Sequence, residues 1–151
     1  GFIFSILVSE SFFLLIINTF LIAFCTNTLN LLDLRPGRSL KIFFITAAGI
    51  MLYVFLGNHV SRPVLLLLPP LGAALGFFPY DISARTMLGD TGSNTLGILL
   101  GIFSVLLLPV SIRTALLGLL FLLHLYTEKH SLSETIERYR FLRYLDEWGR
   151  P

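Results

Sequence analysis

The feature that most constrains this chain is a series of five long apolar segments separated by short polar ones. An α-helix needs about 20 predominantly apolar residues to cross the hydrocarbon core of a bilayer. The five segments reach or approach this length, and they are apolar on every face, which is typical of membrane spans. They cover residues 11–26, 39–56, 63–78, 93–110 and 112–128. Pro69 and Pro70 fall inside the third segment and predict a kink there.

The composition supports the same class of protein. Hydrophobic residues make up 55% of the 151 positions and charged residues only 13%, whereas soluble domains contain about 25% charged residues. We therefore expect an all-α integral membrane protein whose main partner is the lipid bilayer. A net charge of +2 gives no support for nucleic acid as a partner. The chain begins within an apolar run, and we interpret residues 1–151 as the C-terminal portion of a polytopic membrane domain.

Lysine and arginine are distributed unevenly between the two sides that five spans define. The loop after the first span, the loop after the third and the C-terminus share one side, and only Arg62 and Arg113 belong to the other. The shared side holds Arg35, Arg38, Lys41, Arg85, Lys129, Arg138, Arg140, Arg143 and Arg150. Because short loops rich in Lys and Arg stay in the cytoplasm, we predict that these loops and the C-terminus are cytosolic.

Residues 129–151 follow the last span and have an amphipathic pattern. Ser131 and Glu134 have the spacing of a helix capping box. Apolar residues then recur at helical spacing, namely Ile136, Tyr139, Leu142 and Leu145. Two interpretations stay open. The segment is either an interfacial helix on the inner leaflet or a helix packed on the cytosolic ends of the spans.

The loop after the first span carries three polar residues at regular spacing. Asn27, Asn30 and Asp33 are three positions apart, so a helix would present them along one face. Two amides and a carboxylate at the end of a span could hold Mg²⁺, a diphosphate or a sugar. The alternative is a polar helix end followed by a basic anchor.

The loop after the third span contains a glycine-rich stretch around a carboxylate. Gly89 and Gly92 flank Asp90, and Ser93 is expected to open the next helix. Glycine lets the backbone approach a ligand closely, and a helix N-terminus favours phosphate. Asp90 is then a candidate ligand for Mg²⁺, which prefers oxygen donors. The alternative is an Asp or Ser helix cap in a glycine-rich turn.

Both stretches resemble the signatures of one family. "NTLNLLD" is similar to the N-A-x-N-x-x-D-G motif of the polyprenyl-phosphate N-acetylhexosamine-1-phosphate transferases. "FFPYDISARTMLGDTGSNTLG" is similar to the second signature of that family, F-x-P-A-x-x-F-M-G-D-x-G-S-x-x-L-G. The family includes the phospho-N-acetylmuramoyl-pentapeptide translocase of peptidoglycan synthesis. It also includes N-acetylglucosamine-1-phosphate transferases that initiate teichoic acid and O-antigen.

The resemblance implies a reaction and a set of site residues. An undecaprenyl or other polyprenyl phosphate attacks the β-phosphate of a UDP-N-acetylhexosamine at the cytosolic face of a bacterial plasma membrane, with Mg²⁺ as cofactor. The resemblance implies that Asp90 is the Mg²⁺ ligand and that Asp33 is catalytic with it. It places Asn27 and Asn30 against the nucleotide sugar. Gly89, Gly92 and Ser93 would shape the loop around Asp90.

The chain departs from the family pattern in three respects. Leu34 replaces the glycine that follows the aspartate of the first motif, and no aspartate precedes Asp33 to match a pair on an earlier helix. Of the histidines that the family carries in its last cytosolic loop, only His130 is a candidate here, and an ordinary loop histidine is the preferred interpretation of it.

Three functional hypotheses therefore remain. The first is an active transferase, with a GlcNAc-1-phosphate donor preferred to the pentapeptide donor because histidines are few. The second is a non-catalytic relative that binds lipids or partner proteins. The third, a transporter, is weaker because the polar residues lie at the ends of the spans. A homodimer also stays open.

Overall fold

The computed structural model describes residues 1–9, 11–57 and 62–150, and within them every regular element is a helix. Five helices or helix pairs are long and apolar enough to cross a membrane, which confirms the predicted fold class. The elements are α1 (Phe2–Val8), α2 (Phe12–Leu32), α3 (Arg38–Leu56), α4 (Arg62–Leu65), α5 (Leu68–Ile82), α6 (Gly89–Leu107), α7 (Val110–Lys129), α8 (Leu132–Arg138) and α9 (Arg140–Glu147).

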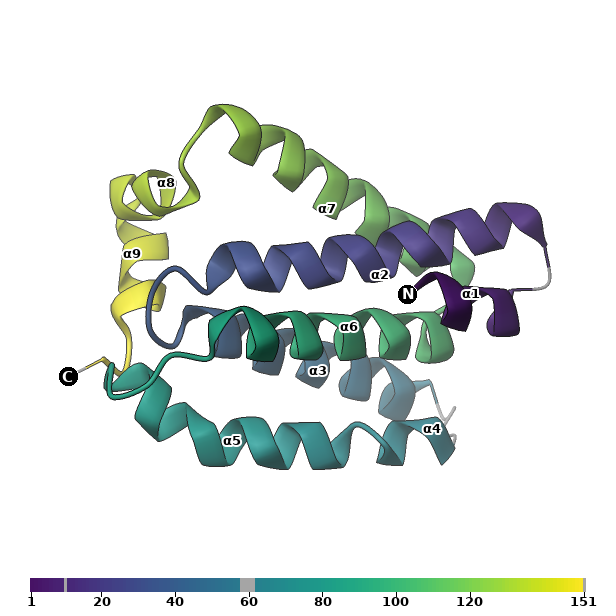
Figure 1. The fold of residues 1–151 in the computed structure, drawn as a ribbon, viewed down its shortest axis with the longest axis horizontal. Coiled ribbons are helices and arrows are strands. Elements are labelled where there is room, and N and C mark those ends of the chain that lie inside the picture. Colours follow the sequence, from purple (N-terminus) through teal and green to yellow (C-terminus); the bar gives the residue numbers. More distant parts are fainter. Residues whose placement is uncertain (10, 58–61, 151) are drawn as a thin grey trace.

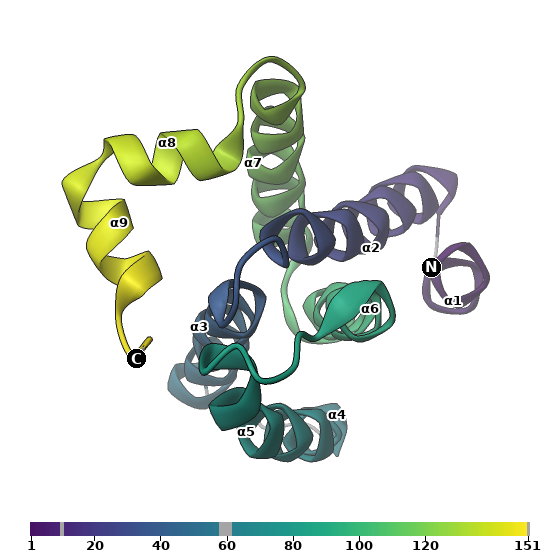
Figure 2. The same ribbon diagram turned by 60° about the vertical axis from the view of Figure 1, so that its left-hand side comes forward.

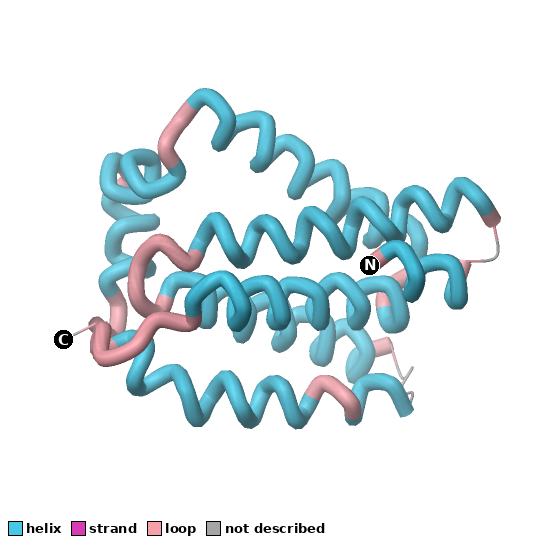
Figure 3. Tube along the Cα trace, viewed as in Figure 1, coloured by secondary structure: helices cyan, strands magenta, loops and turns pink. Residues whose placement is uncertain are grey.

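The connections between the helices divide the bundle into two ends (Figures 1 and 3). The α2–α3 connection, the α5–α6 connection and the C-terminal helices α8 and α9 lie together at one end, which we call the polar end. The α1–α2 and α6–α7 connections lie at the opposite end. The structure thus confirms that the three basic regions share one side of the bundle, whereas their cytosolic location stays a prediction.

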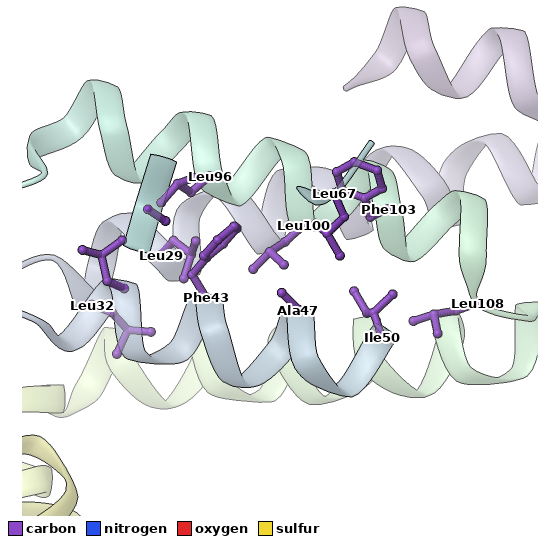
Figure 4. Close-up of a cluster of buried hydrophobic side chains, with 12 residues drawn as sticks. Leu29, Leu32, Phe43, Ala47, Ile50, Leu67, Leu96, Leu100, Phe103 and Leu108 are labelled. Carbon is purple, nitrogen blue, oxygen red and sulfur yellow. The ribbon is translucent and has the colours of Figure 1, made fainter. Parts of the chain in front are cut away.

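The core lies between α2, α3 and α6 (Figure 4). Leu29 of α2, Phe43 and Ala47 of α3, and Leu96 and Leu100 of α6 are buried together in one cluster. By contrast, α7 buries none of its residues, and it diverges from the other spans in Figure 1. Among the described residues, most of the apolar surface of α7 is therefore uncovered.

Helices α2 and α6 approach each other closely because two glycines of α6 face α2. A Cβ atom added to Gly97 would lie 2.5 Å from Cα of Thr26, and one added to Gly101 would lie 2.6 Å from Cα of Ile22. The two glycines are four positions apart and so occupy one face of α6. Small residues at this spacing are the usual means by which membrane helices pack backbone to backbone.

Helix boundaries differ from the predicted spans in several places, and α5 continues to Ile82 beyond the predicted end at residue 78. Helix α2 continues to Leu32, so Asn27 and Asn30 lie within it, and α6 begins at Gly89 rather than at Ser93. The third span breaks at residues 66–67 and not at the proline pair. Pro69 instead lies in the first turn of α5, where the missing N–H removes no intrahelical hydrogen bond.

The tail is helical and amphipathic, as predicted, but it is divided into α8 and α9 at Tyr139, whose backbone is extended. Ser131 Oγ accepts a hydrogen bond from the Glu134 N–H at 3.4 Å, as the capping box predicts. Helix α9 is held against the bundle through Asp146, the one residue that it buries, and this contact agrees with the second interpretation. Phe141, Tyr144 and Trp148 are exposed on the tail and are left free to contact a bilayer surface.

A buried ion pair fastens α9 to the start of α3. Arg38 donates two hydrogen bonds to Asp146, from Nε to Oδ1 at 2.7 Å and from Nη2 to Oδ2 at 3.0 Å. Arg150 donates two more to the same carboxylate and one to the carbonyl of Pro36. Burial acts to raise the pKa of Asp146, but its hydrogen bonds and charge interactions with the arginines outweigh burial and hold it below the ordinary value.

Candidate functional site

Three carboxylates gather at the polar end, each at the end of a different span. Asp33 is the C-terminal cap of α2, Asp81 lies in the last turn of α5, and Asp90 lies in the first turn of α6. Asp33 and Asp81 are buried, whereas Asp90 is exposed. The short α2–α3 and α5–α6 connections keep these three helix ends together (Figure 1).

The carboxylates are close enough to influence one another electrostatically. The pKa of Asp33 is raised from 3.8 to about 6. Burial is the largest cause, and the negative charges of Asp81 and Asp90 also raise it, whereas a hydrogen bond from the backbone amide of Gly89 lowers it. A raised carboxyl pKa means that the charged form is disfavoured in this place. The site therefore carries negative charge that the neighbouring side chains do not neutralise.

Asp81 was not singled out by the sequence motifs, although it lies inside the second one. Its Oδ2 accepts a hydrogen bond from the backbone N–H of Gly37 at 2.9 Å, which joins α5 to the α2–α3 connection. Its Oδ1 is buried and has no hydrogen-bond partner among the described residues. A charged residue at the end of an apolar span is a signal that could have identified it.

The glycine-rich stretch forms the beginning of α6 and not a separate loop. Gly89 has φ +67°, a left-handed conformation that glycine adopts without strain. The N-cap position is Leu88, and no side chain caps the helix, so the structure does not support the alternative of an Asp or Ser cap. A Cβ on Gly92 would come within 2.7 Å of the Leu88 side chain.

A hydrogen bond connects the two motifs across the α2–α6 contact. The hydroxyl of Ser93 lies 3.0 Å from Asn30 Oδ1, and it also lies 2.9 Å from the carbonyl of Gly89. Asn27, one turn earlier on α2, is exposed and lines a groove of about 410 Å³ together with Asn94 of α6. The spacing of Asn27, Asn30 and Asp33 along one helix face, predicted from the sequence, is therefore present and directed toward α6.

His130 is the predicted site residue that the structure does not bring to this cluster. It is exposed at the end of α7, and its ring lies 4.8 Å from that of Tyr126, measured between centroids. In Figures 1 and 2 the α7–α8 connection and the start of α6 are on opposite sides of α2. This arrangement favours the interpretation of His130 as an ordinary loop histidine.

Within the described residues, no three His, Cys, Asp or Glu side chains are arranged to hold one metal ion by themselves. Mg²⁺ sites commonly use only one or two carboxylates, with waters and substrate phosphates completing the shell. Exposed Asp90, buried Asp33 and the Oδ1 of Asp81, which has no hydrogen-bond partner among the described residues, fit that kind of site. They do not fit an all-protein cage.

The raised pKa of Asp33 predicts a stability change at neutral pH. The folded pKa of about 6 exceeds the unfolded value of 3.8, so ionised Asp33 destabilises the fold. This penalty is absent below about pH 4, grows as the pH rises to about 6, and is complete above it. Asn at position 33 removes the penalty.

In metal-free buffer at about pH 7.5, we expect the Asp33→Asn variant to unfold at a higher temperature, by about 2–4 °C for each kcal/mol gained. The difference should disappear near pH 4. A variant that is no more stable than the natural protein at about pH 7.5 would show that the ionised, buried Asp33 carboxylate does not destabilise the fold.

Comparisons with known proteins match a family model and a curated relative. The family model described as Glycosyl transferase family 4 matches residues 1–108, which include both polar motifs. A phospho-N-acetylmuramoyl-pentapeptide-transferase of Protochlamydia amoebophila (strain UWE25) is 33% identical over 103 residues, covering 58% of this chain and 25% of that protein. The chain thus spans about a quarter of the length of this relative. No solved structure matches.

The family match covers most of the chain, and the aligned segment contains the spans that position Asp33, Asp81 and Asp90. The chain is a multi-pass membrane protein by its helices, and it belongs to glycosyl transferase family 4.

Proposed function

We propose that this chain contributes the nucleotide-sugar side of the active site of a sugar-phosphate transferase in a bacterial plasma membrane. The reaction transfers an N-acetylhexosamine-1-phosphate from a UDP-sugar to a polyprenyl phosphate and initiates a cell-wall or surface glycan. The observation that carries the proposal is the gathering of Asp33, Asp81 and Asp90 at one end of five apolar helices, beside the uncapped N-terminus of α6.

The position of the carboxylates suits the two substrates. A polyprenyl phosphate keeps its chain in the bilayer, whereas a UDP-sugar comes from the aqueous phase. A site at the end of the spans gives both access, and the basic residues of the same end support a cytosolic location. An oxygen of the lipid phosphate would bond to the β-phosphorus, the bond from that phosphorus to the bridging oxygen would break, and UMP would leave with that oxygen.

The residues of the two motifs would divide the work. Asp90 is exposed and can bind Mg²⁺, and Asp33 faces the same place from α2. Asn27 and Asn30 offer amide groups to the sugar and the nucleotide. Gly89, Gly92 and Ser93 fix the start of α6, whose free N–H groups favour a phosphate.

Mg²⁺ is proposed as the cofactor because, among the described residues, no Lys, Arg or His side chain forms an ion pair with Asp33, Asp81 or Asp90. When bound, it would neutralise the diphosphate and the leaving UMP. Asp81 holds the α2–α3 connection through Gly37, so it would keep Asp33 in place whether or not its Oδ1 reaches the ion.

The sugar donor is the finer part of the proposal. We infer an N-acetylhexosamine donor, with UDP-GlcNAc preferred because the segment after the last span, residues 129–151, carries only one histidine, His130. The Protochlamydia relative is named for a pentapeptide donor, so UDP-N-acetylmuramoyl-pentapeptide must be included in any test.

UMP release by the purified full-length protein tests the proposal. We expect release that requires undecaprenyl phosphate, a UDP-N-acetylhexosamine and Mg²⁺ together, and that stops when EDTA is added. Omission of the lipid phosphate is the control for simple hydrolysis. If no donor in a panel that includes UDP-GlcNAc and UDP-N-acetylmuramoyl-pentapeptide yields UMP, the protein is a non-catalytic binding relative, as the second hypothesis from the sequence has it.

A further inference from the structure

An apolar groove lies between the tail and the outer side of α3. It has a volume of about 360 Å³, and its walls come from Leu32 at the end of α2, from α3, from the later part of α5, and from helices α8 and α9 with the residue that follows them. The walls are almost wholly apolar and include Ile45, Phe78, Ile136, Leu142 and Trp148. Figure 2 shows α9 on one side of α3 and the start of α6 on the other.

One edge of this groove carries excess positive charge. Arg38, Lys41 and Asp146 line it, and Arg150 is bonded to Asp146. Both arginines share this one carboxylate, whereas Lys41 Nζ donates to two backbone carbonyls, those of Leu145 at 3.2 Å and Asp146 at 2.7 Å. Three cations thus face one carboxylate.

The other carboxylates near the end of the tail do not correct the imbalance. Glu137 pairs with Arg35, and Glu147 pairs with Arg143 at 2.9 Å. The groove therefore combines a long apolar wall with an edge whose net charge is positive. This combination is complementary to a molecule that has an apolar chain and an anionic head.

The groove also lies where a membrane lipid would be found. Lys41 is in the first turn of the α3 span, which is the depth of lipid headgroups if α3 crosses the bilayer. Ile45, one turn further along the span, is 67% exposed, and Trp148 on the opposite wall is 65% exposed. The apolar part of the groove is thus open to the lipid phase, and Trp148 has the interfacial position that tryptophan favours.

We propose that this groove binds one acyl chain of an anionic phospholipid, with the headgroup phosphate beside Lys41. The proposal commits to a phospholipid of the bilayer and not to a polyprenyl phosphate acceptor, because α3 separates the groove from the start of α6 where Asp90 lies. It does not depend on the proposed transferase activity.

The bound lipid would act on the site through the tail. Asp146 holds Arg38, and Arg150 holds the carbonyl of Pro36, next to the Gly37 N–H that binds Asp81. A lipid that fixes α9 against α3 therefore stabilises the α2–α3 connection that carries Asp33.

Trp148 supplies the test, because it is the one tryptophan of these 151 residues. The full-length protein, with any tryptophan outside these residues replaced by phenylalanine, is reconstituted in phosphatidylcholine vesicles. Equal mole fractions of brominated phosphatidylglycerol or brominated phosphatidylcholine are then introduced, and quenching of Trp148 fluorescence is measured. We expect the anionic lipid to reach half-maximal quenching at about fivefold lower mole fraction than phosphatidylcholine. One Lys near an anionic lipid surface increases the affinity by about this factor.

Two substitutions separate binding from general charge. Lys41→Gln should abolish the preference for the anionic lipid, and Lys41→Arg should retain it. Lys129→Gln, at the end of α7 and outside the groove, is the matched control and should retain it too. A thermal midpoint within about 2 °C of the natural protein shows that the Lys41→Gln variant is folded. If the midpoint falls by more, the lipid preference of Lys41→Arg and the competition by unbrominated lipids decide the question.

Three results would overturn the proposal. One is equal quenching by the two brominated lipids, and another is an unchanged preference in folded Lys41→Gln. The third is relief of quenching by a few mole per cent of unbrominated undecaprenyl phosphate but not by unbrominated phosphatidylglycerol, which would make the groove an acceptor site. If the natural protein shows the preference for the anionic lipid but no transferase activity, that result counts against the proposed function and not against lipid binding in the groove.

Discussion

Replacing Asp90 with alanine in the full-length protein is expected to lower the rate of UMP release by roughly 1000-fold or more, equivalent to about 4 kcal/mol in the activation barrier. Asp90 is the exposed carboxylate of the three that gather at the polar end, and phosphoryl transfer between two anions depends on charge neutralisation and alignment. The initial rate at saturating UDP-sugar, measured across a Mg²⁺ titration, checks this result.

Two variants control the Asp90 experiment. Thr91→Ala changes the neighbouring exposed position in the same helical turn, and Glu147→Ala removes an exposed carboxylate on α9 whose partner is Arg143. Both should keep the rate within about threefold of the natural protein. If Asp90→Ala retains the rate of these controls, the carboxylate cluster is not the site of transfer.

Replacing Gly97 with leucine should cause the largest loss of stability among the substitutions proposed for this protein. Its Cβ would lie 2.5 Å from Thr26 Cα and 2.9 Å from the carbonyl oxygen of Cys25, and backbone atoms cannot rotate away. Helices α2 and α6 would have to separate, at a cost of about 3 kcal/mol or more. The thermal midpoint should fall by about 6–12 °C, and activity should fall with it because Ser93 and Asn30 would move apart.

Gly118→Leu is the matched control for Gly97→Leu. Gly118 lies on α7, and an added Cβ would meet no atom within 4 Å. Its variant should unfold within about 2 °C of the natural protein. Equal midpoints for the two leucine variants would mean that α2 and α6 are not packed through Gly97.

The sequence predicts what depends on local pattern. Spans were predictable because apolar residues continue on all faces of each helix, and the shared face of Asn27, Asn30 and Asp33 follows from the helical repeat. The side of the bundle on which the basic loops lie follows from counting spans. Apolar character and the helical repeat act within one segment, and the side on which a loop lies depends only on how many spans precede it. None of these predictions requires knowledge of how the helices pack.

The rest depends on contacts between distant segments. Asp81 belongs to the site because the Gly37 N–H, 44 positions away, binds it, and no local pattern shows that contact. The predicted first span ends at residue 26 because polar Asn27 and Asn30 interrupt the apolar run, whereas the helix packs against α6 and continues to Leu32. The contact between Asp146 and Arg38, 108 positions apart, is likewise not visible in any local pattern.

The most direct test of the proposed transfer follows the β-phosphate itself. The full-length protein is incubated with undecaprenyl phosphate, Mg²⁺ and a UDP-N-acetylhexosamine labelled with ³²P only in the β-phosphate, and the lipid and aqueous phases are counted. The proposal predicts that the label enters the lipid phase, in a diphosphate-linked sugar, in equal amount to the unlabelled UMP released. Label that stays in the aqueous phase, as the intact donor, sugar phosphate or inorganic phosphate, would contradict it.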